Sequence, residues 1–448
     1  MYYKIPMRRD IYSNLVKWKN SSDRKPLLLK GARQVGKTYL LQEFGKKEYK
    51  KLAYFDFEED PNLKELFTGK ISPDKILEKL SIASEQKITA KNTLIVFDEV
   101  QECPPAITSL KYFYDKAPEY HVIASGSLLG IRLGQDSSFP VGKVNIINLY
   151  PFSFYEFLTG IGAKKLRKLV EDKRDFTKLN KKFHIELIEY LKIYFFVGGM
   201  PEVIGQYKKD NKNFKKIRNI QKNILTGYET DFGKHSSKSE TLKIKKIWET
   251  IPKELAKENK KFMLSHVKKN ARYRDYEHAI QWLKDSGYIY LSKRIKRPNL
   301  PLKAYTEKNI FKLFFLDTGL LGAMLDIPMK IIVEGDKLFN WYKGAFTENY
   351  VAQQLVGGGN AFVSSTDESL YYWNSGETAE IDFIIQSGGD IYPLDVKSGK
   401  NLKSESLKVY KNRYTPQYLC RTSMLNFSTG NKYFDFPLYA INLFPDIL

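Results

Sequence analysis

Cysteine and histidine are scarce in this sequence, which has 2 Cys and 5 His among 448 residues. Two cysteines cannot form a disulfide framework, so a reducing compartment, the cytoplasm, is expected. The histidines have no ligand spacing to one another or to cysteine, and a zinc site is therefore not expected.

Long apolar runs are also missing. The best candidate for a membrane span, Leu313 to Leu325, is too short and contains Asp317. No signal peptide is visible at the start of the sequence, because no apolar segment is found there. We therefore expect no membrane partner.

Acidic residues are outnumbered: 73 Lys and Arg against 51 Asp and Glu give a net charge of +22. This excess makes polyanions such as nucleic acids the first partners to consider, although a solvated lysine surface would give the same composition. Hydrophobic residues make up 42% of the chain, which is enough for folded cores. The length predicts about two to four domains.

The first third of the sequence alternates short apolar strands with helical stretches, which is typical of a parallel α/β sheet. The expected strands are Leu27–Lys30, Leu52–Phe57, Thr93–Phe97, His121–Ser125 and Val144–Leu149. Charged helices are expected next, for example from Lys178 to Phe195. After about residue 340, one helix precedes further alternating strands.

The clearest motif is a phosphate-binding loop between the first expected strand and a helix expected from Thr38 to Phe44. The loop consists of Gly31, Ala32, Arg33, Gln34, Val35, Gly36, Lys37 and Thr38, which fit the spacing G-x-x-x-x-G-K-[ST]. Backbone N–H groups of such a loop wrap the phosphates of ATP, and the following helix N-terminus adds partial positive charge. Lys37 is expected to reach the β- and γ-phosphates, and the Thr38 hydroxyl to bind Mg²⁺.

Two carboxylates at the end of the third expected strand supply the second half of a nucleotide site. Asp98 is expected to hold Mg²⁺ through water, and Glu99 to polarise the attacking water. A helix N-cap is the weaker alternative for this pair. Ser125, which ends the next strand, is the first candidate for sensing the γ-phosphate, with Ser127 second. A plain serine turn explains either residue equally well.

These motifs resemble the branch of P-loop ATPases that carries a catalytic glutamate and includes the AAA+ proteins. Eight stretches together resemble one widespread prokaryotic family of predicted AAA+ ATPases. They are Gly31–Thr38, Phe97–Gln101, Ala124–Leu129, Leu149–Phe154, Gly198–Pro201, Tyr228–Phe232, Leu316–Leu321 and Asp395–Gly399.

The resemblance implies an α/β fold with four parts. They are a P-loop ATPase domain (1–160), a helical lid or connector (161–238), a winged-helix-like part (239–330) and a PD-(D/E)xK nuclease-like, restriction-endonuclease-like α/β domain (331–448). It also allows a homo-oligomer, for which Arg132 is the candidate arginine finger. One departure is Asn374, where relatives are expected to have an Arg, so a phosphate would be bound less well there.

The expected winged-helix-like part is strongly basic. A helix from Tyr273 to Ser286, ended by Gly287, precedes a hairpin of Tyr288–Ile295 and Leu302–Tyr305. The basic residues are Lys268, Lys269, Arg272, Arg274, Lys293, Arg294, Lys296 and Arg297. They favour contact with DNA phosphates, while a spacer between two domains is the alternative.

A second hairpin, from residue 380 to 397, is acidic on one face. A turn at Gly388-Gly389 would set Asp382 opposite Asp395 and Glu380 opposite Lys397. Two opposed carboxylates repel each other unless a cation lies between them. Pro393 weakens the interpretation, because proline is disfavoured inside central strands.

Glu348 lies on the apolar stripe of the helix before this hairpin, so a metal or a basic partner is expected beside it. The pattern resembles the PD-(D/E)xK nucleases, which implies that Asp382 and Asp395 hold Mg²⁺, Glu348 orients a metal-bound water and Lys397 assists the attacking water. The alternative is a surface Glu348 with a Glu380–Lys397 salt bridge.

Two hypotheses of function follow. The first is an ATPase that couples ATP hydrolysis to DNA binding or processing through a nuclease-like domain. The second is an ATP-gated switch or adaptor whose nuclease-like domain is catalytically silent and binds a partner.

Overall fold

The computed structural model describes residues 8–448 apart from 70–71, 128–139, 141, 212, 235, 256, 258–260, 331–338, 359–369, 377–378, 400–403 and 431. Within these residues the chain forms two compact units. The N-terminal unit comprises residues 8–150 with 285–287, and the C-terminal unit comprises residues 151–284 and 288–448. Arg132 lies outside the described residues.

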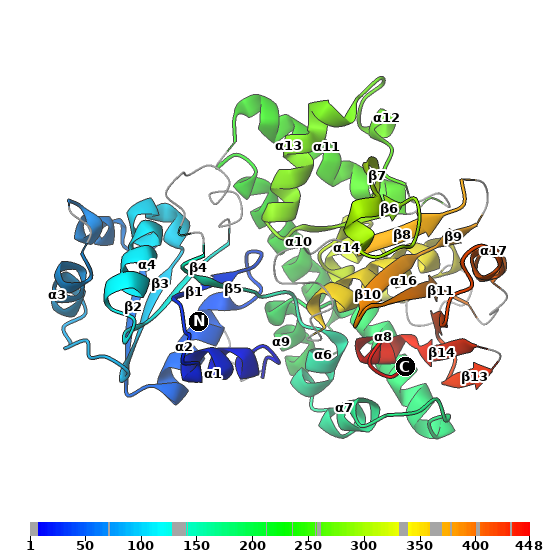
Figure 1. Ribbon diagram of the computed structural model, residues 1–448, viewed down its shortest axis with the longest axis horizontal. Coiled ribbons are helices and arrows are strands. Elements are labelled where there is room, and N and C mark those ends of the chain that lie inside the picture. Colours follow the sequence, from blue (N-terminus) through cyan, green and yellow to red (C-terminus); the bar gives the residue numbers. More distant parts are fainter. Residues whose placement is uncertain are drawn as a thin grey trace. The chain divides into compact units, whose positions relative to one another are not determined.

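The N-terminal unit is built on a five-stranded parallel sheet with the order β2-β3-β4-β1-β5 (Figure 1). Its strands are β1 (Leu27–Lys30), β2 (Lys51–Asp56), β3 (Thr93–Asp98), β4 (His121–Gly126) and β5 (Asn145–Asn148). All five expected strands are confirmed, with ends that differ by one residue at most. Strand β4 lies between β1 and β3, so the carboxyl ends of these three strands are neighbours.

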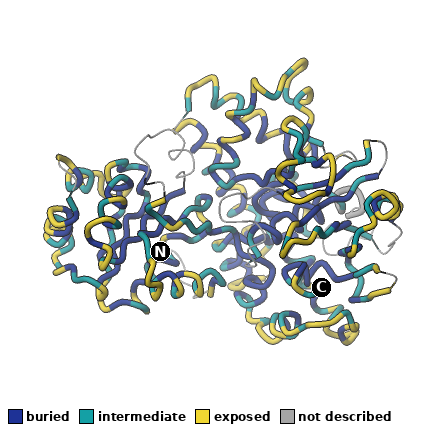
Figure 2. Tube along the Cα trace, in the orientation of Figure 1, coloured by how far each residue is buried: buried dark blue, intermediate teal, exposed yellow. Residues whose placement is uncertain are grey.

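The burial of apolar side chains explains why these segments form a sheet. Strands β3 and β4 are buried along their whole length, as are the first three residues of β1 (Figure 2). On β2 the buried residues alternate, and Phe55 packs with Phe97 in a cluster of aromatic rings. The helical elements of the unit are α1 (Tyr12–Asn20), α2 (Lys37–Glu48), η1 (Pro61–Phe67), α3 (Pro73–Ala83), η2 (Val100–Glu102) and α4 (Pro104–Lys116).

The C-terminal unit begins with helices. They are α6 (Phe154–Gly160), α7 (Lys164–Glu171), α8 (Lys181–Val197), α9 (Pro201–Lys209), α10 (Phe214–Asp231), α11 (Lys238–Leu255), α12 (Leu264–Val267) and α13 (Tyr273–Asp285). Local signals set their ends: Asn180 caps α8 by accepting a hydrogen bond from the Lys182 N–H. Gly287 has a φ of +73° after α13, as the sequence predicted.

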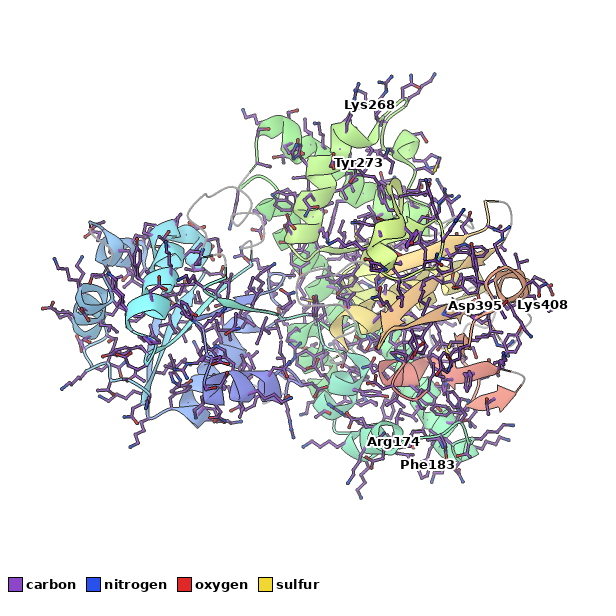
Figure 3. The ribbon with its side chains drawn as sticks, in the orientation of Figure 1. Arg174, Phe183, Lys268, Tyr273, Asp395 and Lys408 are labelled. Carbon is purple, nitrogen blue, oxygen red and sulfur yellow. The ribbon has the colours of Figure 1, made fainter. Side chains whose placement is uncertain are left out.

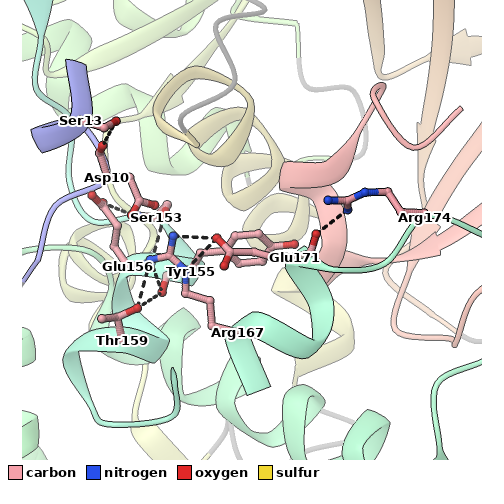
Figure 4. Close-up of polar contacts among 9 residues, drawn as sticks. All are labelled: Asp10, Ser13, Ser153, Tyr155, Glu156, Thr159, Arg167, Glu171 and Arg174. Carbon is pink, nitrogen blue, oxygen red and sulfur yellow. Dashed lines mark hydrogen bonds and ion pairs between the residues drawn. The ribbon is translucent and has the colours of Figure 1, made fainter. Parts of the chain in front are cut away.

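The corner between α6 and α7 shows how side chains complete such helices (Figure 4). Ser153 and Glu156 form a capping box at the start of α6. Arg167 on α7 donates to the Thr159 hydroxyl over 3.0 Å and to Glu171 Oε1 over 2.8 Å. The bond to Thr159 links α7 to α6, whereas the bond to Glu171 lies within α7.

Two sheets follow in the same unit. One has the order β7-β6-β8-β9, with β6 (Ile289–Ile295), β7 (Thr306–Phe315), β8 (Leu370–Asn374) and β9 (Glu380–Ile381). The other has the order β10-β11-β12-β14-β13, with β10 (Phe383–Ser387), β11 (Asp390–Val396), β12 (Leu419–Ser423), β13 (Ser428–Gly430) and β14 (Tyr433–Pro437). The remaining helical elements are η3 (Leu302–Tyr305), α14 (Thr318–Met324), α16 (Phe339–Gly357), α17 (Glu405–Tyr414) and η4 (Leu438–Leu443).

The prediction of a strand at Leu302–Tyr305 is wrong. That segment is a short 3₁₀ helix after Pro301, in which only Leu302 is buried. The partner of β6 is β7, whose inner half from Phe311 to Phe315 is continuously buried. Strand β8 pairs in parallel with β6, so strands expected in the winged-helix-like part and in the nuclease-like part share one sheet.

No helix in the described part of the chain is long and apolar enough to cross a membrane.

Candidate nucleotide site and a second carboxylate cluster

The phosphate-binding loop joins the end of β1 to the start of α2. A Cβ atom on Gly31 would lie 2.3 Å from the Leu149 carbonyl oxygen, so a larger residue does not fit there. Gly36 has a φ of +96° and occupies the N-cap of α2, where it has no side chain to cap the helix. The first N–H groups of α2 are thereby left to an external acceptor such as a phosphate.

Lys37 is buried and its ammonium group lies against the loop. Its Nζ donates to the carbonyl oxygens of Gly31 and Ala32, each at 3.0 Å. Arg9, which was not predicted, is also buried: it donates to the Val35 carbonyl over 2.9 Å and to the Tyr150 carbonyl over 2.6 Å. Arg9 therefore links Val35 in the phosphate-binding loop to Tyr150, which follows β5.

Asp98 is fully buried at the carboxyl end of β3 and accepts hydrogen bonds from three hydroxyl groups. Thr38 Oγ1 is 2.7 Å and Tyr54 OH is 2.5 Å from Asp98 Oδ2. The Ser125 hydroxyl donates to Oδ1, as does the Glu99 N–H over 3.0 Å. The structure thus brings together Thr38 in the first turn of α2, Asp98 at the end of β3 and Ser125 of β4.

Tyr54 stays a hydrogen-bond donor in this environment. Burial, and then the negative charge of Asp98, raise the pKa of Tyr54 far above its ordinary value. No motif pointed to Tyr54, but its place on β2, the strand next to β3, puts it within reach of Asp98.

Glu99 adopts a left-handed backbone conformation with a φ of +47°. Its Oε2 atom accepts a hydrogen bond from Gln101 Nε2 over 2.6 Å and lies 3.4 Å from both the N atom and the hydroxyl of Ser127. The two candidate serines therefore differ, because Ser125 contacts Asp98 whereas Ser127 contacts Glu99. Gln101, the last residue of the Phe97–Gln101 stretch, was not predicted as a partner of Glu99.

The acidic hairpin in the C-terminal unit has the predicted register. Ser387 pairs with Asp390 across Gly388 and Gly389, whose φ values of +59° and +93° suit a two-residue turn. The ladder continues to Phe383 and Leu394. Pro393 is tolerated because the pairing of β11 with β12 begins one residue later, at Leu394.

The pairing of Glu380 with Lys397, expected from the same register, is wrong. The chain bends at Asp382, and Glu380 pairs with Asn374 of β8 instead. Lys397 Nζ lies 2.9 Å from Asp395 Oδ2, and Asp382 Oδ2 accepts the Val396 N–H over 2.8 Å. Asp382 therefore remains beside the end of β11 although it is not part of the ladder.

Lys312 of β7 is the residue that the sequence reasoning missed here. It is fully buried, and its Nζ is 2.5 Å from Glu380 Oε1, 3.5 Å from Glu348 Oε2 and 4.0 Å from Asp382 Oδ1. The predicted burial of Glu348 beside a basic partner is confirmed, and the alternative of a surface Glu348 is wrong. Burial alone lowers the pKa of Lys312, but the three carboxylates outweigh it, so the net pKa is raised and Lys312 is charged.

The basic segment around α13 is exposed at most of its charged side chains. Lys268, in the loop before α13 (Figure 3), is exposed, as are Arg272, Lys296 and Arg297. Arg294 is different, because it forms an ion pair with Glu307 of β7. The helix buries its predicted apolar stripe, which consists of Tyr276, Ala279, Ile280 and Leu283.

Comparison with known families agrees with the geometry of the N-terminal unit. Residues 23–158 match a family described as an AAA domain. Residues 188–330 and 343–441 match two families described as domains of unknown function. No curated protein matches the sequence.

Among solved structures, a Walker-type ATPase of Pyrococcus abyssi is 16% identical over 71% of this chain and 96% of that chain, with a TM-score of 0.44. PCH-2 of C. elegans is 14% identical over 49% of this chain and 67% of that chain, with a TM-score of 0.30. The Orc1 protein of Aeropyrum pernix, solved in complex with DNA, is 10% identical over 71% and 91%, with a TM-score of 0.29. Scores this low carry no argument about function. Residues 23–158 thus resemble an AAA domain, and the parallel sheet and the phosphate-binding loop agree with that match.

Proposed function

We propose that the N-terminal unit binds ATP and hydrolyses it with Mg²⁺. The observation that carries this proposal is the convergence of the loop, Lys37, Thr38 and Asp98 at the carboxyl ends of β1 and β3. When bound, Mg²⁺ would neutralise phosphate charge, and Thr38 with Asp98 would hold it. Their oxygen atoms fit the ligand preference of this ion.

Each residue of the site has a separate task in this proposal. Lys37 exchanges its carbonyl partners for phosphate oxygens, which are stronger acceptors because they are charged. Glu99 accepts a proton from the attacking water. Ser125 keeps the Asp98 carboxylate in place, and the sequence-based expectation that it senses the γ-phosphate is part of the same proposal.

We further propose that ATP turnover is coupled to nucleic acid, most directly DNA, bound by the basic segment around α13. The exposed Lys268, Arg272, Lys296 and Arg297 support this, because they present four positive charges to solvent. Their contacts to phosphates would release counterions, so binding should weaken steeply as salt rises. A flat response between low and physiological ionic strength would count against the basic segment as a DNA surface.

The second hypothesis, an ATP-gated adaptor with a silent nuclease-like domain, is favoured by one specific observation. Lys312 supplies a positive charge among the carboxylates that a nuclease would use to hold a metal ion. One experiment separates the two hypotheses: incubation of the protein with assorted DNAs and Mg²⁺ or Mn²⁺, with and without ATP. Cleavage that is lost on Asp395→Asn supports a nuclease, whereas DNA-stimulated ATP hydrolysis without cleavage supports the adaptor.

A further inference from the structure

We propose that Lys312 is the permanent counter-ion of Glu348, Glu380 and Asp382, and that these carboxylates do not bind a divalent metal ion. The proposal goes beyond ATP hydrolysis, because it concerns the C-terminal unit alone. It replaces the Mg²⁺ expected at Asp382 with an ammonium group that belongs to the chain.

The position of Lys312 carries the argument. Its side chain is fully buried on β7, which also carries the exposed Lys308. Three carboxylates from α16, β9 and the bend at Asp382 lie within 4.0 Å of Nζ. The ring of Tyr372 on β8 adds a further favourable surface, with its centroid 5.0 Å from Nζ. A buried ammonium with this many partners is a fixed part of the structure.

A divalent ion does not fit the same donors. Mg²⁺ requires near-octahedral oxygen ligands at about 2.0–2.1 Å. Glu348 Oε2 and Asp382 Oδ1 face the positively charged Lys312, and Asp382 Oδ2 accepts the Val396 N–H. Asp395 is paired with Lys397. In the described part of the chain, no group of three His, Cys, Asp or Glu side chains is arranged to hold a metal ion.

The cluster also joins two regions of the sequence. Lys312 lies within residues 188–330, whereas Glu348, Glu380 and Asp382 lie within residues 343–441, the extents of two separate family matches. The ion pairs therefore link these two regions inside the C-terminal unit. We infer that their task is to hold this joint together.

The test uses the full chain without nucleotide and compares Lys312→Met with Lys308→Met. Lys308 is on the same strand but exposed, and its ion pair with Glu277 is on the surface. In thermal unfolding, Lys308→Met should match the wild type, while Lys312→Met should unfold several degrees lower because it removes the cation beside the buried Glu348 and Asp382 and the partly exposed Glu380. Adding Glu348→Gln and Glu380→Gln to Lys312→Met should recover part of the loss.

Mn²⁺ provides the second measurement. The wild-type midpoint should not respond to Mn²⁺ through these residues, so Asp382→Asn should leave any response unchanged. Should Lys312→Met fail to fold, Mn²⁺ binding to the wild type and to Asp382→Asn still decides the question. Mn²⁺ binding that Asp382→Asn abolishes, or a Lys312→Met variant as stable as Lys308→Met, would overturn the proposal. Neither measurement reads ATP hydrolysis, so the proposed function is tested separately.

Discussion

Asp98 and Asp382 are two buried carboxylates at strand ends, and they differ in the charge of their partners. Asp98 accepts hydrogen bonds from the neutral hydroxyls of Thr38, Tyr54 and Ser125. Within the described residues, no Lys or Arg forms an ion pair with Asp98. Asp382 instead lies beside the ammonium group of Lys312.

This difference shows how one kind of residue serves two purposes. Hydroxyl groups orient Asp98 without cancelling its charge, so the carboxylate remains attractive to an incoming cation. Lys312 offsets part of the negative charge near Asp382 and faces one of its oxygens, and the other oxygen accepts the Val396 N–H, which leaves less to gain from binding a metal ion. The charge of the partners therefore separates Asp98, the proposed Mg²⁺ ligand, from Asp382.

The largest expected effect is that of Lys37→Ala. Hydrogen bonds to charged groups contribute about 1.5–3 kcal/mol, so nucleotide affinity should fall by roughly 10-fold to 150-fold. ATP turnover should become undetectable. Equilibrium binding of a fluorescent ATP analogue measures the change, and Lys46→Ala on the exposed side of the same helix is the matched control. Unchanged binding in Lys37→Ala would contradict the role of Lys37 in the proposed nucleotide site.

Glu99→Gln should keep ATP bound but slow its hydrolysis by about 100-fold or more, because the amide cannot accept a proton from water. Steady-state turnover and ATP affinity, measured on the same preparation, separate the two effects. Glu102→Gln is the control, since Glu102 lies three residues further on and pairs with Lys64 at 3.6 Å. Hydrolysis at the wild-type rate would show that Glu99 has another role.

Tyr54→Phe tests whether the hydroxyl groups prepare Asp98 for Mg²⁺. Removing one hydrogen bond to a buried carboxylate should raise the Mg²⁺ concentration needed for half-maximal turnover by about tenfold, which corresponds to about 1.4 kcal/mol. The half-buried Tyr112 supplies the control variant Tyr112→Phe. If the Mg²⁺ requirement stays the same, Tyr54 merely fills space.

The smallest predicted effect concerns pH and distinguishes the two units as wholes. Burial, reinforced by Arg24, Lys19 and Lys91, lowers the pKa of His121 to about 4. The unfolded chain therefore binds a proton between about pH 6.5 and 4 that the folded N-terminal unit does not, so its stability should fall as the pH falls through this window. The loss should be on the order of 1–3 kcal/mol.

Chemical denaturation at a series of pH values, followed by hydrogen exchange in each unit, measures this loss. His121→Gln should flatten the response of the N-terminal unit, whereas His278→Gln, at an exposed position of α13, should not. A response of the same size in His121→Gln would assign the acid sensitivity to other groups.

The N-terminal sheet could be predicted because its signals are local. Each strand is a short apolar run, and the loop between β1 and α2 has fixed spacing from Gly31 to Thr38. The register around Gly388-Gly389 was equally local, since a two-residue turn fixes the pairs on both sides of it.

Two of the missed residues act across the fold. Lys312 and Glu348 are 36 positions apart, and Tyr54 and Asp98 are 44 apart, so no spacing in the sequence connects them. The bend at Asp382 was missed for a related reason. It exists because β9 pairs with β8 while β10 pairs with β11. The sequence of this short segment does not indicate that its two halves belong to different sheets.

The most direct test of the comparison is the number of Mn²⁺ ions bound per chain in the presence of a saturating, non-hydrolysable ATP analogue. Electron paramagnetic resonance of free Mn²⁺ gives this number. We expect one ion per chain, lost in Asp98→Asn and retained in Asp382→Asn, because the partners of Asp98 are neutral hydroxyl groups whereas Asp382 faces the positive charge of Lys312. Two ions per chain, one of which disappears in Asp382→Asn, would contradict the account.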